Sequence, residues 1–220
     1  ARANKALKVG LQVYVILLRL GLNPKSLISP ANAYKEKLDT LEIPLLKDIP
    51  PGASEIAYEC CSGNWVECYK RGHFPQVTDL DITSAYPYQA MKLLNLRYGD
   101  WIHRPDYQPK ATYGYARCEV MIDSPFSPVS YEPDTEQQFT PTGIFERSLT
   151  KGMIDFINDH LGYATVLDGW WFTAKSNKHP LEKPVLELYA EKNKSTGFRR
   201  EIVKRIMSGS FYGGFIQLKG

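Results

Sequence analysis

The chain has 220 residues, of which 43% are hydrophobic and 12% are aromatic. Composition of this kind excludes a disordered chain, because enough apolar side chain is present to bury a substantial core in one large domain or two small ones. The net charge of +3 is too small to indicate a nucleic-acid partner by itself, so the distribution of the positive charge matters more than its total.

The pattern of apolar residues predicts both helices and strands without an even alternation of the two. In the first half of the chain we expect helices at 4–20 and 28–41, a linker at 49–52, a strand at 75–82, and a helix, or a turn followed by a helix, from 84 to 96. In the second half we expect a strand at 111–122, a Pro-rich connection at 125–141, a helix at 150–161 and a strand at 164–174. Two helical segments, broken near "KSTG", are expected over 181–211. The predicted fold class is therefore α+β, with a helical hairpin at its end.

The cysteines and the first residues bear on the compartment. The four cysteines form neither a paired CxxC set nor a dense disulfide framework, which predicts a reducing compartment. A zinc site built from Cys61, Cys68 and His73 is disfavoured, because the spacing does not match the usual ligand spacings.

The apolar segment 5–22 has no small-residue cleavage site and is interrupted by Arg19, so it predicts a core-packed helix and neither a signal peptide nor a membrane partner. The start "ARANKALK" lacks an initiator methionine, so we expect a piece of a longer protein.

The stretch "DLDITSAYPYQ" places acids at one end of the predicted strand 75–82. Because side chains alternate along a strand, Asp79 and Asp81 are expected on one face, with Leu80 and Ile82 directed into the core. Such a carboxylate pair is tolerable in water or beside a cation, and Mg²⁺ takes one or two carboxylates together with substrate phosphates. The acids by themselves leave two interpretations open, a metal site or ordinary solvated residues at a strand end.

The segment "FRREIVKRIMSGSFYGG" at 198–214 predicts a basic helix with two different faces. Its apolar side is formed by Ile202, Val203, Ile206 and Met207. A second row carries Glu201, Arg205, Gly209 and Tyr212. A guanidinium, a residue without a side chain and a tyrosine in one row suit a triphosphate lying against the helix, whereas a solvated basic helix with a buried tyrosine is the other interpretation.

Together the two segments resemble a known family. The residues Asp81, Ser84, Tyr86 and Pro87 in "DITSAYP" are similar to motif A of family B DNA polymerases, and "RIMSGSFYGG" is similar to their motif B. The sequence between the motifs resembles the connecting region of the protein-primed branch found in phages and linear plasmids. The family carries a Tyr-x-Gly-Gly or Tyr-x-Gly-Ala stretch ahead of motif A, and "AYECCSGNWVECYKRG" at 57–72 occupies that place.

The resemblance implies a role for each matching position. It makes Asp81 a catalytic ligand of Mg²⁺ or Mn²⁺, helped by the carbonyl of Ile82, and it makes the Tyr86 ring a steric gate that excludes the 2′-hydroxyl of a ribonucleotide. The incoming dNTP is expected at Ser84, Ala85, Tyr86, Arg205, Gly209 and Tyr212. The DNA primer-template is expected at Tyr58, Lys204, Ser210 and Gly213.

Three departures from the family pattern qualify these roles. Arg205 stands in place of the phosphate-binding lysine, Gly209 stands in place of the motif B asparagine, and no motif C "DTD" hairpin is present to supply the second aspartate of a two-metal site. The sequence ends seven residues after Gly213. We therefore expect residues 1–220 alone to be inactive and to need a polymerase segment that carries motif C.

The predicted protein is the palm and fingers portion of a DNA-directed DNA polymerase in the host cytoplasm, with a terminal protein as a further partner. The expected domains are a helical segment at 1–50, the tail of an exonuclease domain, then a palm with motif A and an inserted connecting region at 51–180, a fingers hairpin with motif B at 181–213, and the start of a returning palm segment at 214–220. Two alternatives stay open at this point. One is a polymerase-derived structural or interaction module without catalysis, and the other is a hydrolase built on Asp79 and Asp81.

Overall fold

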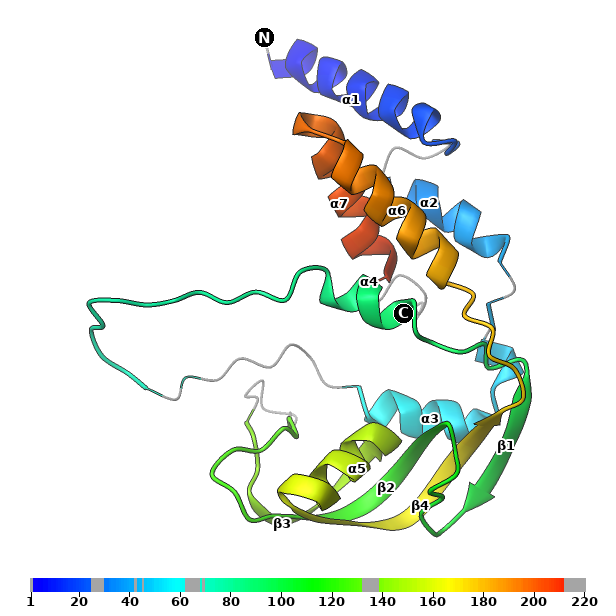
Figure 1. Ribbon diagram of the computed structural model, residues 1–220, viewed down its shortest axis with the longest axis vertical. Coiled ribbons are helices and arrows are strands. Elements are labelled where there is room, and N and C mark those ends of the chain that lie inside the picture. Colours follow the sequence, from blue (N-terminus) through cyan, green and yellow to red (C-terminus); the bar gives the residue numbers. More distant parts are fainter. Residues whose placement is uncertain are drawn as a thin grey trace. The chain divides into compact units, whose positions relative to one another are not determined.

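The structure, a computed structural model, describes residues 2–24, 30–41, 43–44, 46–61, 68, 70–131 and 139–211 (Figure 1). The chain divides into two compact units and alternates between them. The helical unit comprises 1–43, 78–95 and 177–220, and the sheet unit comprises 44–77 and 96–176. Helices and an antiparallel sheet confirm the predicted α+β class.

The sheet unit is built on four antiparallel strands in the order β1-β4-β2-β3. These are β1 (Gly99–Arg104), β2 (Tyr113–Ile122), β3 (Gly143–Thr150) and β4 (Gly162–Ala174). Alternate residues of β2 are buried, as the period-two pattern of its sequence predicts. They face helix α5 (Lys151–His160), where Ile154 and Ile157 are fully buried. The predicted strands at 111–122 and 164–174 and the predicted helix at 150–161 are thus confirmed.

Helix α3 (Pro51–Glu59) packs on β2, β3 and β4. It begins with Pro51, whose fixed φ suits the first helical position. The linker predicted at 49–52 is therefore wrong for Pro51 and Gly52, which belong to the helix. Gly52 permits a close approach, because a Cβ atom there would lie 2.7 Å from Trp170 Nε1. The Glu59 carboxylate then accepts hydrogen bonds from Arg117 Nη2 at 2.6 Å and from Ser148 Oγ at 2.6 Å, which ties the end of the helix to two strands.

The helical unit contains α1 (Arg2–Arg19), α2 (Pro30–Asp39), α4 (Ala85–Ala90), α6 (Glu182–Lys194) and α7 (Gly197–Phe211). Its core includes Leu17 of α1, Leu38 of α2, Val185 of α6 and Ile206 of α7. Gly197 begins α7 with a φ of 53°, a conformation that favours glycine and that separates α6 from α7. The break predicted near "KSTG" and the helices predicted at 4–20 and 181–211 are confirmed. The helix predicted at 28–41 is confirmed over Pro30–Asp39, and residues 28 and 29 lie outside the described residues.

The strand predicted at 75–82 is wrong. The segment has no regular secondary structure, and Val77, Leu80 and Ile82 are 76%, 88% and 79% exposed. Leu80 and Ile82 therefore do not point into the core. A strand is stable only when its backbone groups pair with a neighbour, and no strand of the described residues pairs with this segment, so alternating sequence alone was insufficient. The helix expected from 84 is short and ends at Ala90.

Substitution of Glu59 with glutamine is expected to destabilise the sheet unit. The hydrogen bond from Arg117 outweighs the opposing effect of burial and, with the bond from Ser148, lowers the pKa of Glu59 from its ordinary value of 4.5. A lowered pKa in the folded state means that the stabilisation is present above the unfolded pKa and is lost as the pH falls through the folded pKa. We expect a loss of about 1 kcal/mol at pH 7, because the pair is partly exposed and screened.

Urea unfolding of Glu59→Gln and of the wild type at pH 7 and at pH 3 measures this effect. The difference between the two proteins is expected to be larger at pH 7. Glu55→Gln is the matched control, because Glu55 lies on the same helix but its nearest oxygen is 3.9 Å from Arg117. An equal loss from both substitutions, or a difference independent of pH, would contradict the assignment.

Candidate functional site

The two acids singled out in the sequence lie in the helical unit on the segment that leads to α4. Asp79 and Asp81 are both exposed, as is Ile82. Among the residues that the structure describes, no three His, Cys, Asp or Glu side chains are grouped closely enough to hold a metal ion. The role of Asp81 and of the Ile82 carbonyl as metal ligands stays a prediction.

Ser84 has an unusual backbone conformation between these acids and α4. With φ 55° and ψ 43° it adopts the left-handed conformation that non-glycine residues avoid. The surrounding side chains hold it there: Tyr189 donates its hydroxyl hydrogen bond to the Ser84 carbonyl at 3.3 Å, and Lys192 Nζ donates to Ser84 Oγ at 3.2 Å. A costly local conformation that is fixed from two sides is a frequent property of functional sites.

Lys192 is a residue of this site to which motifs A and B assign no role. It is only 7% exposed, although lysine is almost never fully buried without a partner. Its ammonium lies 4.8 Å from the centre of the Tyr189 ring, which provides a cation–π contact besides the bond to Ser84. The sequence does indicate that Lys192 is buried, because it follows Val185 and Leu188 at helical spacing on the buried face of α6.

The first turn of α4 carries the other motif A positions. Ala85, its first residue, is half-buried, and Tyr86 is 54% exposed. Pro87 is buried at the third helical position, where its missing N–H is tolerated. Tyr86 is thus about half exposed, in a turn that the buried Pro87 anchors.

Helix α7 presents the two faces that the sequence predicts. Its apolar side, formed by Ile202, Val203, Ile206 and Met207, is at most 3% exposed. Arg205 is exposed on the other side, and in the described part of the chain it forms no ion pair. Lys204, also exposed, pairs with Glu201 at 3.0 Å. Because α4 contacts both α6 and α7, the motif A turn and this basic helix belong to one assembly of helices.

Gly209 and Ser210 have a packing role that the sequence did not reveal. A Cβ atom at Gly209 would lie 2.8 Å from the Ala31 Cβ of α2, closer than packed side chains come. Ser210 is 5% exposed and donates a hydrogen bond to the Ala31 carbonyl at 3.4 Å. The glycine that replaces the motif B asparagine therefore lets α7 pack closely on α2, and its contact with a nucleotide stays a prediction.

Of the remaining predicted residues, one belongs to the sheet unit and two are not among the described residues. Tyr58 is 63% exposed on α3 in the sheet unit. Tyr212 and Gly213 lie outside the residues that the structure describes. The predicted contacts of all three with nucleotide or DNA stay predictions.

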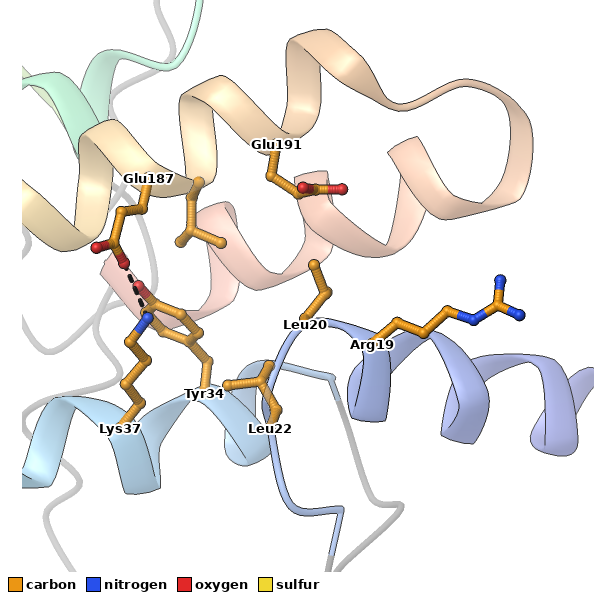
Figure 2. A pocket seen from close by; sticks show the side chains of 8 residues that line it. Arg19, Leu20, Leu22, Tyr34, Lys37, Glu187 and Glu191 are labelled. Carbon is orange, nitrogen blue, oxygen red and sulfur yellow. Dashed lines mark hydrogen bonds and ion pairs between the residues drawn. The ribbon is translucent and has the colours of Figure 1, made fainter.

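A cavity of about 210 Å³ lies elsewhere in the helical unit, lined by α1, α2 and α6 (Figure 2). Lys37 and Glu187 pair across it at 2.9 Å, and this hydrogen bond outweighs burial and lowers the pKa of Glu187. Glu191 also lines it and pairs with Arg199 at 2.7 Å. The charged residues that line it are two cations and two carboxylates, so the cavity offers a triphosphate no excess of positive charge.

Comparison with known proteins relates this arrangement to one group of solved structures. Phi29 DNA polymerase in an orthorhombic crystal form matches 92% of this chain with a TM-score of 0.57 and 15% identity. Its ternary complex with primer-template DNA and incoming nucleotide substrates matches 91% with a TM-score of 0.57 and 16% identity. Its complex with single-stranded DNA matches 91% with a TM-score of 0.55 and 18% identity.

The chain has the fold of part of Phi29 DNA polymerase. These matches show a shared fold over 91–92% of this chain. The chain spans only 37–38% of the length of the three Phi29 structures. No protein-family description and no curated protein matches the sequence. In the part of the chain that the structure describes, no helix is both long and apolar enough to cross a membrane.

Proposed function

We propose that this chain forms the palm and fingers portion of a protein-primed family B DNA polymerase, which transfers nucleotides from dNTPs to a primer 3′-end. One observation carries the proposal. The motif A turn at Ser84 is bonded to α6, and α4 contacts α7, which bears the motif B residues, in a chain with the fold of part of Phi29 DNA polymerase.

Asp81 and the Ile82 carbonyl would hold Mg²⁺ or Mn²⁺, because both residues are exposed and both supply oxygen ligands. The metal, when bound, supplies a Lewis acid that polarises the phosphoryl group under attack. Arg205 then binds the triphosphate, because its guanidinium is exposed and offers paired donors to phosphate oxygens. Tyr86 lies beneath the sugar and excludes a 2′-hydroxyl. Lys192 acts as a positioning residue that holds the Ser84 turn.

The wider assignment follows the same resemblance. Primer-template DNA is the expected macromolecular partner, with Tyr58, Lys204, Ser210 and Gly213 at the interface, and a terminal protein is the expected primer donor. The second catalytic aspartate comes from a segment that carries motif C. The expected compartment is the host cytoplasm, and the domain limits at 50, 180 and 213 stay predictions.

A second candidate function is a polymerase-derived module that binds DNA or protein without catalysis. The observation that favours it is Gly209, whose missing side chain serves the packing of α7 on α2. The hydrolase alternative is weaker, because it uses only the two acids and assigns no task to the Ser84–Lys192 contact.

Binding of primer-template DNA to residues 1–220 is expected to weaken steeply with salt. Each phosphate that a cation neutralises releases counterions, so log Kd rises with log salt by about 0.9 per contact. Replacement of Arg205 with alanine is expected to weaken binding roughly tenfold at low salt and to reduce the slope by about one. Fluorescence anisotropy between 50 and 200 mM salt, about the range over which such slopes are measured, provides the measurement.

Lys110→Ala is the control, because Lys110 is an exposed cation of the sheet unit outside the predicted site. Its binding curve is expected to match that of the wild type. Binding independent of salt, or equal losses from Arg205→Ala and Lys110→Ala, would contradict a phosphate-binding role for α7.

A further inference from the structure

Helix α1 carries two separate apolar stripes. The inner stripe is occupied: Leu17 is 1% exposed in the core of the helical unit, and Val13, Ile16 and Leu20 pack against that core. An ordinary surface helix would present polar residues on its other side. In α1 that side holds a second row of large apolar residues.

The outer stripe consists of Leu7, Leu11, Tyr14 and Leu18. Their exposed fractions are 64%, 55%, 40% and 49%. The spacings of four, three and four residues place them in one row, and this is the spacing of the seam through which two helices pack in a coiled coil. A contiguous apolar row of this kind, left uncovered, marks an interaction surface.

The charges beside the outer stripe indicate which kind of helix fits it. Each stripe residue is followed in the sequence by a member of a neighbouring row, formed by Lys8, Gln12, Val15 and Arg19. This row begins and ends with a cation. Helix α1 contains no Asp or Glu, and within the described ranges neither Lys8 nor Arg19 forms an ion pair. Figure 2 shows the Arg19 guanidinium directed away from the Lys37–Glu187 pair.

We propose that the outer stripe is the docking surface for an acidic amphipathic helix, supplied by the polymerase segment that lies outside residues 1–220. The partner helix carries its own apolar seam and two acidic residues about 16 Å apart, the length of eleven helical residues. A second copy of this chain fits poorly, because two α1 helices would bring only positive charges together. That the partner helix comes from another segment of the polymerase rests on the proposed function and on the 38% of the Phi29 polymerase length that this chain spans. The acidic and apolar character of the partner helix rests on α1 alone.

Peptides of defined sequence test the docking chemistry. The first probe is a labelled amphipathic peptide of about 21 residues with leucines at the same spacing and two glutamates eleven residues apart. The second differs only in having lysines in place of the glutamates. Titration of each with residues 1–220, followed by fluorescence anisotropy, is expected to show roughly fivefold tighter binding of the acidic peptide, the size of two partly screened ion pairs.

Substitutions separate the stripe from the rest of α1. Leu11→Ser is expected to weaken binding of the acidic peptide by about tenfold, whereas Val9→Ser is expected to leave it unchanged, because Val9 is 42% exposed but lies outside the row. Reversal of both cations, Lys8→Glu with Arg19→Glu, is expected to make the lysine peptide the better ligand. Equal binding of both peptides, no binding of either, or equal losses from Leu11→Ser and Val9→Ser would overturn the proposal.

Two further measurements test which molecule binds the outer stripe of α1. Sedimentation equilibrium is expected to show a monomer; a dimer that Leu11→Ser dissociates would identify a second copy as the occupant and overturn the proposal. Co-expression of residues 1–220 with the polypeptide encoded next to them is expected to give a complex that Leu11→Ser weakens and Val9→Ser does not. A complex insensitive to Leu11→Ser, or a gene that encodes no adjoining polypeptide, would show that the partner helix does not come from an adjoining segment of the polymerase. These readouts use no polymerase activity, so they fail independently of the proposed catalysis.

Discussion

Replacement of Asp81 with alanine is expected to lower the primer-extension rate by about a thousandfold or more, once residues 1–220 are joined to a segment that carries the second catalytic aspartate. The physical reason is electrostatic. Asp81 and the second aspartate would hold the divalent ions, and their negative charge would offset the repulsion between the two ions. Single-turnover extension of a labelled primer with Mg²⁺ measures the rate of the chemical step.

Asp79→Ala provides the matched control, because Asp79 is an equally charged and exposed neighbour on the same segment. Its loss is expected to be far smaller, since the resemblance assigns the metal to Asp81. Residues 1–220 without the joined segment are expected to extend no primer. Equal losses from the two substitutions, or extension by 1–220 alone, would show that the second metal ligand lies within this chain.

Replacement of Tyr86 with alanine is expected to reduce discrimination against ribonucleotides by about a hundredfold. Tyr86 lies in the first turn of α4 and is 54% exposed, and the resemblance assigns its ring to the sugar of the incoming nucleotide. Removing it opens space for the 2′-hydroxyl and should raise kcat/KM for a ribonucleotide while changing the value for a deoxyribonucleotide little. The ratio of the two kcat/KM values in the joined polymerase is the measurement.

Two variants on the same helix distinguish a steric gate from a general effect on α4. Tyr86→Phe keeps the ring and is expected to retain the discrimination. Tyr88→Ala removes a ring that is 45% exposed and that Lys92 covers at 4.0 Å, and it is expected to leave the ratio unchanged. A ratio that Tyr86→Ala leaves unaltered would mean that the ring takes no part in sugar recognition.

The contact between Ser84 and Lys192 shows why the candidate site was only partly predictable. Motif A and motif B are short patterns, and each could be read from a few adjacent residues. Lys192, one of the two residues that hold the motif A turn, lies 108 positions further along the chain than Ser84. In the local sequence, the only indication of this contact is a lysine at a buried helical position. The pattern of apolar residues shows that the position is buried, but it does not show which residue the lysine contacts.

Gly209 illustrates the same limit from the opposite direction. In the sequence it is a departure from the motif B asparagine, and it predicts either an altered nucleotide site or a module without catalysis. In the structure it is the residue that α2 approaches, because a Cβ atom there would meet Ala31. The reason for the glycine thus depends on a helix far away in the sequence.

The sequence by itself determined the long helices, the strands β2 and β4 and the buried side of α7, because the periods of 3.6 and 2 are local and record which face is covered. Only the tertiary structure decided that 75–82 is exposed and that Gly99–Arg104 and Gly143–Thr150 are edge strands. The physical reason is that a strand exists through hydrogen bonds to a neighbour remote in the sequence, which its own residues do not specify.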